Sequence, residues 1–190
     1  MPGERRAGLQ DPESVQIFLV DSIRDALKGV DPKQTERLVA RVLSSKRIFL
    51  YGAGRSGFVA RSFTMRLKHL GMPIVRMSID PTTPPTTDDC AIIISGTGET
   101  PSSVDYANLA IGGGAPVFAL THARDSTLAR CGAHVLLLAQ EASPKQAAAA
   151  PLGTIFEEAA LVYLDSLVAV LMGRLGQSES DLRRRHGVTR

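Results

Sequence analysis

Three glycines follow an apolar run in the stretch LYGAGRSGFVARSF, at Gly52, Gly54 and Gly57. Their spacing, G-x-G-x-x-G, is typical of the turn between a strand and a helix that holds a dinucleotide pyrophosphate. Ser56 adds a hydroxyl at the start of the helix, where free amides and the helix dipole favour an anion. The stretch therefore predicts an anion site, for a dinucleotide or for a phosphate monoester.

A second loop with similar chemistry follows the apolar run CAIIIS and reads SGTGETPSS. A dinucleotide fold needs no second cradle at this place, so the two loops together favour one phosphate monoester held by hydroxyls and backbone amides. The residues expected to bind it are Gly54, Ser56, Ser95, Gly96, Thr97, Gly98 and Thr100.

Two alternatives for these loops remain open. Asp80 stands near the position of a ribose-binding acid and keeps the dinucleotide interpretation available. The second loop also fits an ordinary turn with a capping box, in which Ser95 or Thr97 pairs with Glu99. We expect Glu99 to be structural in either case. Neither loop contains the lysine of a Walker A sequence, which argues against a nucleoside triphosphatase.

A carboxylate suited to proton transfer stands at Glu157, early in a long apolar segment. At 100° per residue, Glu157 shares a helical stripe with apolar residues only, whereas Glu158 shares one that contains Asp165. Burial on an apolar face raises a carboxyl pKa toward the range of a general base. The alternative is a capping box from Thr154 to Glu157, and the residues alone do not choose between the two.

The histidines and cysteines give weaker indications of function. We expect His69 to be packed inside the protein or at an interface and His186 to lie exposed in the basic tail, and we assign no role to His122 or to the fourth histidine, His134. The two cysteines, Cys90 and Cys131, stand far apart without a partner motif. They predict buried reduced thiols rather than a metal site or a disulfide.

These groups need a scaffold, and apolar runs alternating with helical patterns predict one. Two N-terminal helices open with Asp-Pro, at Asp11 and Asp31, where the aspartate can cap the helix. We expect strands at 47–51, 74–77, 91–95, 116–120 and 134–138. We expect helices at 56–70, 102–111 and 126–130, a long one from about 154 and a short one from about Ser178, while 139–153 forms a loop or weakly helical cover.

This alternation predicts an α/β domain with a five-stranded parallel sheet and helices on both faces. Two loops that face each other across a switch point favour the flavodoxin-like order 2-1-3-4-5. Residues 1–45 are expected to pack as N-terminal helices on the domain formed by 46–190, as one structural unit.

Composition excludes several classes of protein. The chain has 190 residues and a formal charge of +3, concentrated in the tail, so we expect no nucleic-acid partner. Nothing resembles a secretory signal, and three carboxylates interrupt the longest apolar stretch, which argues against a membrane partner and favours a cytoplasmic protein. The helix from Thr154 to Met172 is apolar around most of its circumference, which predicts a homo-oligomer.

Four stretches resemble the sugar isomerase (SIS) domain family, and within it the hexulose-phosphate isomerase branch. They are GAGRSGFVARSFTMRLKHLG, SGTGET, PLGTIFEEAALVYLDSLVA and DLRRRH, and with their spacing they cover nearly all of the chain past the first helix. SGTGET marks SIS domains generally, whereas GAGRSGFVAR and PLGTxFE are similar to the hexulose-phosphate isomerase branch. The stretch 77–89 and the ending RHGVTR depart from that branch, which puts the substrate identity in doubt.

The resemblance implies an enzyme of the ribulose monophosphate pathway that interconverts 3-hexulose 6-phosphate and fructose 6-phosphate without a metal or organic cofactor. It implies a homotetramer, Glu157 as the catalytic base and His186 as a residue that closes over a neighbouring subunit's substrate. The alternatives are an SIS isomerase for another phosphosugar and a non-catalytic sugar-phosphate-binding regulatory module.

Overall fold

The computed structural model describes residues 11–76, 83–131, 134–138 and 144–186. The helices are α1 (Pro12–Leu27), α2 (Pro32–Ser44), α3 (Gly54–His69), α4 (Pro101–Gly112), α5 (Thr127–Arg130), α6 (Pro144–Ala149), α7 (Thr154–Arg174) and α8 (Glu179–Arg185). The strands are β1 (Ile48–Gly52), β2 (Ile74–Arg76), β3 (Cys90–Ile94), β4 (Val117–Thr121) and β5 (His134–Leu137).

The strands form one sheet in the order β2-β1-β3-β4-β5, and every neighbouring pair is parallel. The expected alternation of strands and helices and the parallel sheet are therefore confirmed. The register pairs Gly52 at the end of β1 with Ile94 at the end of β3. The loops that follow these two strands consequently start side by side at the carboxyl edge of the sheet.

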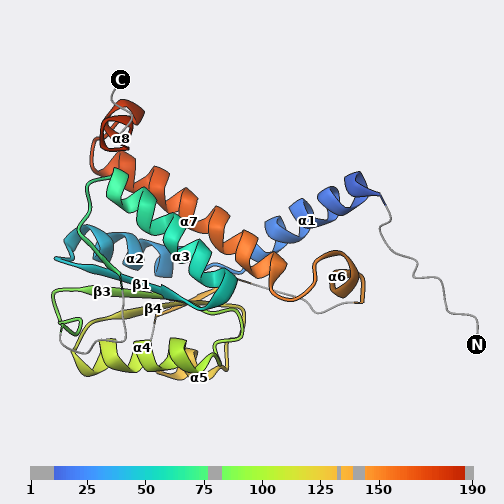
Figure 1. Cartoon of the computed structure of the whole chain (residues 1–190), viewed down its shortest axis with the longest axis horizontal. Coiled ribbons are helices and arrows are strands. Elements are labelled where there is room, and N and C mark those ends of the chain that lie inside the picture. The colour runs from blue at the N-terminus through green and yellow to red at the C-terminus, as the bar shows by residue number, and fades with distance from the viewer. Residues whose placement is uncertain (1–10, 77–82, 132–133, 139–143, 187–190) are drawn as a thin grey trace, which may run out of the picture.

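Helices cover both faces of the sheet, with α3 and α7 on one side and α4 and α5 on the other (Figure 1). Alternate residues of a strand point to opposite faces, so Ile48 and Leu50 join the core under α3 and α7 while Phe49 joins the core over α4. The central strand β3 is buried along its whole length. Two apolar cores thus hold the carboxyl edge in place from above and below.

The N-terminal helices begin as the sequence predicts, because Asp11 and Asp31 each accept a hydrogen bond from a backbone amide in the first helical turn. In α2, Leu38 and Val42 belong to the same core as α3 and α7. Helix α1 contacts α7 and extends away from the sheet (Figure 1). At the other end of the chain, Ser178 and Asp181 form the capping box of α8.

The segment 139–153 includes the short helix α6, in keeping with the expected loop or weakly helical cover, and three of its six residues are alanines, which have high helix propensity. One local expectation needs correction. Cys90 is buried, and burial raises the pKa of its thiol to about 12, but Cys131 is only partly buried because it caps the short helix α5 at the surface. Asp80 and the end of the tail lie outside the described residues.

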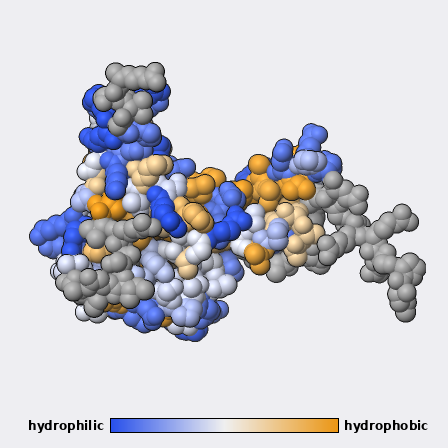
Figure 2. Space-filling view, in the orientation of Figure 1, coloured by the Kyte–Doolittle hydropathy of each residue, from blue (hydrophilic) through white to orange (hydrophobic). Residues whose placement is uncertain are grey.

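Apolar side chains remain exposed on several helices. Among them are Ile17 and Val20 on α1, Phe58 and Met65 on α3, Ile111 on α4, and Val162 and Val170 on α7. Apolar surface is visible along α1 and beside it in Figure 2. Within the residues that the structure describes, no helix is both long enough and apolar enough to span a membrane.

Candidate functional site

A cavity of about 540 Å³ opens between the loops at the carboxyl ends of β1 and β3 and the start of α7. The predicted residues that line it are Gly54, Ser56, Ser95, Gly96, Thr97, Thr100 and Glu157. The structure therefore brings both anion loops and the candidate base to one place. Of the predicted site residues, Gly98 and His186 do not line this cavity.

The first loop wraps closely around the start of α3. A Cβ on Gly52 would lie 2.6 Å from the backbone of Ser56, and Gly54 has a φ of +53°, so both positions favour glycine. The residue that caps α3, Ala53, provides no side-chain hydrogen bond to the helix. The amides of the first turn are therefore left without a side-chain cap beside the cavity, which suits an anion.

The second loop is held by its own hydroxyls. The buried Ser95 donates from Oγ to Thr100 Oγ1 over 3.3 Å, and Thr121 donates from its hydroxyl to the carbonyl of Gly96 over 2.8 Å. A Cβ on Gly96 would lie 3.1 Å from the ring of Phe156. The loop is thus fixed against β4 and α7, with Ser95, Thr97 and Thr100 at the cavity wall.

Gly98 and Glu99 lie on the side of this loop that contacts the start of α5. Gly98 has a φ of +65°, and a Cβ there would lie 2.2 Å from Ser126 Oγ, so its lack of a side chain allows close packing against the start of α5. The carboxylate of Glu99 accepts hydrogen bonds from the amide and the hydroxyl of Thr127. Glu99 is therefore a structural residue at the start of α5, rather than a partner in a capping box for α4, whose capping residue Thr100 makes no side-chain hydrogen bond to the helix.

Glu157 is the carboxylate of the cavity. Its side chain is 13% exposed, and Arg55 Nε lies 2.6 Å from Oε2. Burial raises the pKa of Glu157, the neighbouring Arg55 opposes that rise, and Glu158 adds to it. The direction expected from the apolar stripe is therefore confirmed, while the ion pair with Arg55 is a feature that the helical pattern does not reveal.

The helical stripes also separate the two glutamates as predicted. Leu164 and Val168, which share the stripe of Glu157, are buried, whereas Val162 and Asp165 on the stripe of Glu158 are exposed. Glu157 therefore projects from the inner face of α7, toward α3 and the cavity.

The capping-box alternative does not describe the start of α7. The capping residue is Gly153, and it makes no side-chain hydrogen bond to the helix. The hydroxyl of Thr154 instead donates to the carbonyl of Pro151 over 2.7 Å. The Glu157 carboxylate is therefore not committed to the helix terminus and faces Arg55 and the cavity.

His186 lies at the opposite end of α3. Its exposed ring contacts the buried ring of His69 of the same chain, with ring centroids 4.6 Å apart and the planes tilted by 45°. Arg185 holds this end of α8 by donating from Nη1 to the carbonyl of His69 over 2.9 Å. Within one chain His186 is thus kept away from Glu157, and a role for it in a neighbouring subunit's site stays a prediction.

Two cavity residues were missed by sequence reasoning, Arg55 and His122. Arg55 stands between Gly54 and Ser56 in the first loop, so its position in an anion loop was a usable signal. His122 comes directly after β4, at the same edge of the sheet. Its ring contacts Phe156 edge-on with centroids 5.7 Å apart, and burial lowers its pKa, so a neutral imidazole lines the cavity at neutral pH.

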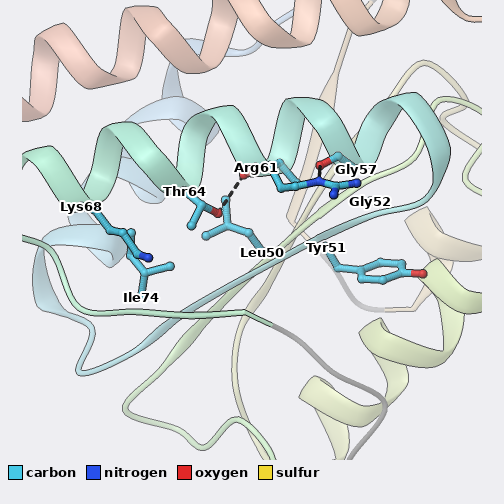
Figure 3. Close-up of a pocket in the computed structure, with 9 residues that line it drawn as sticks. Leu50, Tyr51, Gly52, Gly57, Arg61, Thr64, Lys68 and Ile74 are labelled. Atoms are coloured by element: carbon cyan, nitrogen blue, oxygen red, sulfur yellow. Dashed lines mark hydrogen bonds between the residues drawn. The ribbon is translucent and has the colours of Figure 1, made fainter. Parts of the chain in front are cut away.

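A second cavity, of about 300 Å³, lies between α3 and strands β1 and β2 (Figure 3). Its polar side chains form local hydrogen bonds, because Arg61 donates to the carbonyl of Gly57 and Thr64 donates to that of Ala60. Lys68 and Ile74 line its other end. Since the loop cavity has hydroxyls and the uncapped starts of α3 and α4 at its wall, it is the better candidate for a phosphorylated ligand. Among the described residues, no cluster of three or more histidine, cysteine or carboxylate side chains is arranged to hold a metal ion.

Comparisons with known proteins agree with this geometry. The family model of the SIS domain matches residues 42–162. An uncharacterized protein of Archaeoglobus fulgidus is 37% identical over 173 residues, which cover 88% of this chain and 94% of the relative. A 3-hexulose-6-phosphate isomerase of Methanocaldococcus jannaschii is 36% identical over 154 residues, which cover 80% of this chain and 81% of the relative.

A solved structure from Methanococcus jannaschii is similar along most of the chain. It has a TM-score of 0.75 and 31% sequence identity, and the match covers 92% of this chain and 97% of the other. Its description infers a molecular function of 3-hexulose-6-phosphate isomerase. With the family model matching most of the chain and both anion loops in place, the chain belongs to the SIS domain family.

Proposed function

We propose that this protein interconverts 3-hexulose 6-phosphate and fructose 6-phosphate. The observation that carries the proposal is the position of Glu157, a largely buried carboxylate that shares one cavity with the hydroxyls of two anion loops. Relatives named 3-hexulose-6-phosphate isomerase support this choice of sugar. We further propose that the reaction belongs to the ribulose monophosphate pathway.

The two loops would hold the phosphate group. Ser56, Ser95, Thr97 and Thr100 offer hydroxyls, and the starts of α3 and α4 lack side-chain caps. Hydrogen bonds from such groups to a charged phosphate contribute about 1.5 to 3 kcal/mol each. This binding energy fixes the sugar so that its carbon chain extends toward α7.

Glu157 would move the proton. Fructose 6-phosphate carries its carbonyl at C2, so the carboxylate removes the proton from C3, and the electron pair forms an enediolate. The hydroxyl proton on O3 then moves to O2, and returning the first proton to C2 leaves the carbonyl at C3 and gives 3-hexulose 6-phosphate. One carboxylate on one face of the intermediate can perform both transfers. The neutral imidazole of His122 lines the same cavity, where it can donate a hydrogen bond to an oxygen of the intermediate.

The substrate assay tests this proposal. Purified protein is mixed with 3-hexulose 6-phosphate, and fructose 6-phosphate is followed as it appears, with no metal or nicotinamide cofactor added. Formation at enzymatic rates supports the proposal. Turnover of a different phosphosugar would identify another SIS isomerase, and tight binding without any turnover would identify a regulatory module.

Calorimetry tests the phosphate site separately. Fructose 6-phosphate should bind, whereas fructose should bind barely at all, because the loops recognise the charged end. Equal affinity for the two sugars contradicts the phosphate cradle. A clear thermal shift with NAD would restore the dinucleotide interpretation.

We further propose a cytoplasmic homo-oligomer, most simply a tetramer. The exposed apolar side chains of α1, α3 and α7 need cover, and the two cysteines are free thiols, as is usual in a reducing compartment. Light scattering at micromolar concentration should give a multiple of the chain mass, and a monomeric mass contradicts the assembly.

A further inference from the structure

One arginine connects the two functional halves of the cavity. Arg55 stands in the first turn of α3, next to Ser56 of the phosphate loop. Its Nε lies 2.6 Å from Glu157 Oε2, and its Nη2 lies 3.4 Å from Glu158 Oε1. The residue that precedes a phosphate-binding hydroxyl is therefore the same one that pairs with the candidate base.

Glu157 depends on this contact alone for a countercharge. Oε2 of Glu157 is buried and has no hydrogen-bond partner, although Arg55 is close to it. Within the described residues, no second cation forms an ion pair with this carboxylate. If the guanidinium moves away, the carboxylate stays buried without a countercharge, and such a group holds a proton more strongly.

Arg55 is free to move in a way that Glu157 is not. The side chain of Arg55 is 51% exposed, compared with 13% for Glu157. A phosphate monoester carries up to two negative charges and accepts two parallel hydrogen bonds from a guanidinium. It is therefore a stronger partner for Arg55 than Glu157, whose one contact lies outside hydrogen-bond geometry, or Glu158, whose contact is 3.4 Å long.

We propose that the phosphate of the substrate and Glu157 compete for Arg55, so that filling the phosphate loops releases Glu157 from its ion pair and makes it a stronger base. This inference rests on the proposed function, because it needs both the phosphate cradle and Glu157 as the base. It makes Arg55 a positioning residue whose partner changes when the substrate binds.

Through this exchange, phosphate binding would raise the basicity of Glu157, the group that removes the proton from C3. An ion-paired carboxylate is a weak base, whereas an unpaired buried one has its pKa nearer to neutral, where proton abstraction is most efficient. An empty site would keep Glu157 ionised and paired. Binding energy from the non-reacting end of the substrate would thus activate the base that removes the proton from C3.

Proton uptake on binding tests the exchange directly. Fructose 6-phosphate is titrated into the intact protein by calorimetry, in buffers of different ionisation enthalpy, between about pH 6 and pH 8. If binding raises the pKa of Glu157, protons are taken up between its free and bound pKa values. The protonation of the phosphate itself contributes equally in Glu157→Gln, so subtracting that variant isolates the glutamate.

We expect the wild-type protein to take up more protons than Glu157→Gln, by a fraction of a proton per bound ligand, because part of the bound Glu157 must stay ionised to accept the proton from C3. Arg55→Met removes the ion pair beforehand, so its uptake should be smaller and its affinity weaker. Arg55→Gln is a second variant with the same expectation. Glu36→Gln, which removes an exposed glutamate that pairs with Arg174 away from the cavity, is the matched control and should behave like the wild type.

Three results bear on the proposal in different ways. Equal proton uptake in the wild type and Glu157→Gln overturns the exchange while leaving the phosphate site and the isomerase function intact. Wild-type uptake in both Arg55 variants, with their fold checked by circular dichroism, also overturns it, because the phosphate charge alone would then act on Glu157. Failure of fructose 6-phosphate to bind overturns the proposed function and the exchange together.

Discussion

Two arginine–carboxylate pairs stand at opposite edges of the same sheet, and they behave in opposite ways. At the amino edge, Asp89 accepts from Arg47 Nε and Nη2 over 3.1 and 2.6 Å and from the amide and hydroxyl of Thr86 over 2.7 and 2.9 Å. At the carboxyl edge, Glu157 has one close nitrogen, on Arg55. The presence of an arginine therefore does not decide what a buried carboxylate does.

The number of hydrogen bonds that the carboxylate accepts decides the direction of its pKa shift. Burial alone would raise the pKa of Asp89, but Arg47 and Thr86 outweigh it and lower the pKa to about 2. For Glu157, burial outweighs Arg55 and raises the pKa. A fully bonded carboxylate is a structural anchor, whereas a carboxylate with an unused lone pair beside a cavity is able to take a proton.

The largest expected effect comes from Glu157→Gln, which removes the proton acceptor and keeps the shape of the side chain. Turnover should fall on the order of a hundredfold or more, while the melting temperature is not lowered. Steady-state kinetics and thermal melts measure both. Glu36→Gln, at an exposed glutamate that pairs with Arg174 away from the cavity, is the control and should turn over at nearly the wild-type rate. Normal turnover by Glu157→Gln would direct the search for the base to His186 of a neighbouring subunit.

The next-largest effect is a loss of stability, and it is expected from Asp89, the structural anchor at the amino edge of the sheet. Asp89→Asn leaves Arg47 without its countercharge and weakens the bonds from Thr86, so the free energy of unfolding should fall by about 3 kcal/mol. Urea unfolding measures this loss, and turnover per folded molecule should be unchanged because Asp89 is at the far edge from the cavity. A variant as stable as the wild type would contradict the anchoring role.

The stabilisation by Asp89 should also depend on pH. The folded pKa of Asp89 is about 2 and its ordinary value is 3.8. The stabilisation is therefore fully present above about pH 4 and is lost as the pH falls toward 2, with a size of about 2 kcal/mol. Urea unfolding of the wild type and Asp89→Asn across this range should converge at low pH. A constant gap between them is the contrary outcome.

The smallest effect is the reverse dependence at Glu157. Because its folded pKa is raised, its contribution to stability is present below its unfolded pKa and is lost as the pH rises through the folded pKa. Glu157→Gln should therefore melt like the wild type at about pH 4 and slightly higher at neutral pH. A wild-type protein that gains stability over the variant as the pH rises would show that the pKa shift has the opposite sign.

Much of the fold could be predicted because it follows local rules. The aspartates at Asp11 and Asp31 cap their helices, and the apolar runs become buried parallel strands. The raised pKa of Glu157 was also within reach, because the two stripes of α7 depend only on helical periodicity. Each of these features is encoded within a short stretch of sequence.

The contacts between distant segments could not be predicted in this way. Arg55 meets Glu157 only because β1 and α7 are brought to the same edge of the sheet, about a hundred residues apart in the chain. His122 reaches the cavity through the pairing of β4 with β3. The contact of His186 with His69 likewise needs α8 to pack against the end of α3. No periodicity in the sequence records these contacts.

The most direct test of the central claim, that Glu157 removes the proton from C3, is nuclear magnetic resonance of fructose 6-phosphate in heavy water. The wild-type protein should replace the C3 proton with deuterium, because the carboxyl group exchanges its proton with solvent while the enediolate persists. Glu157→Gln, with its fold and its affinity for fructose 6-phosphate retained, should leave the C3 signal unchanged over the same time. Exchange at the wild-type rate in Glu157→Gln would contradict the claim.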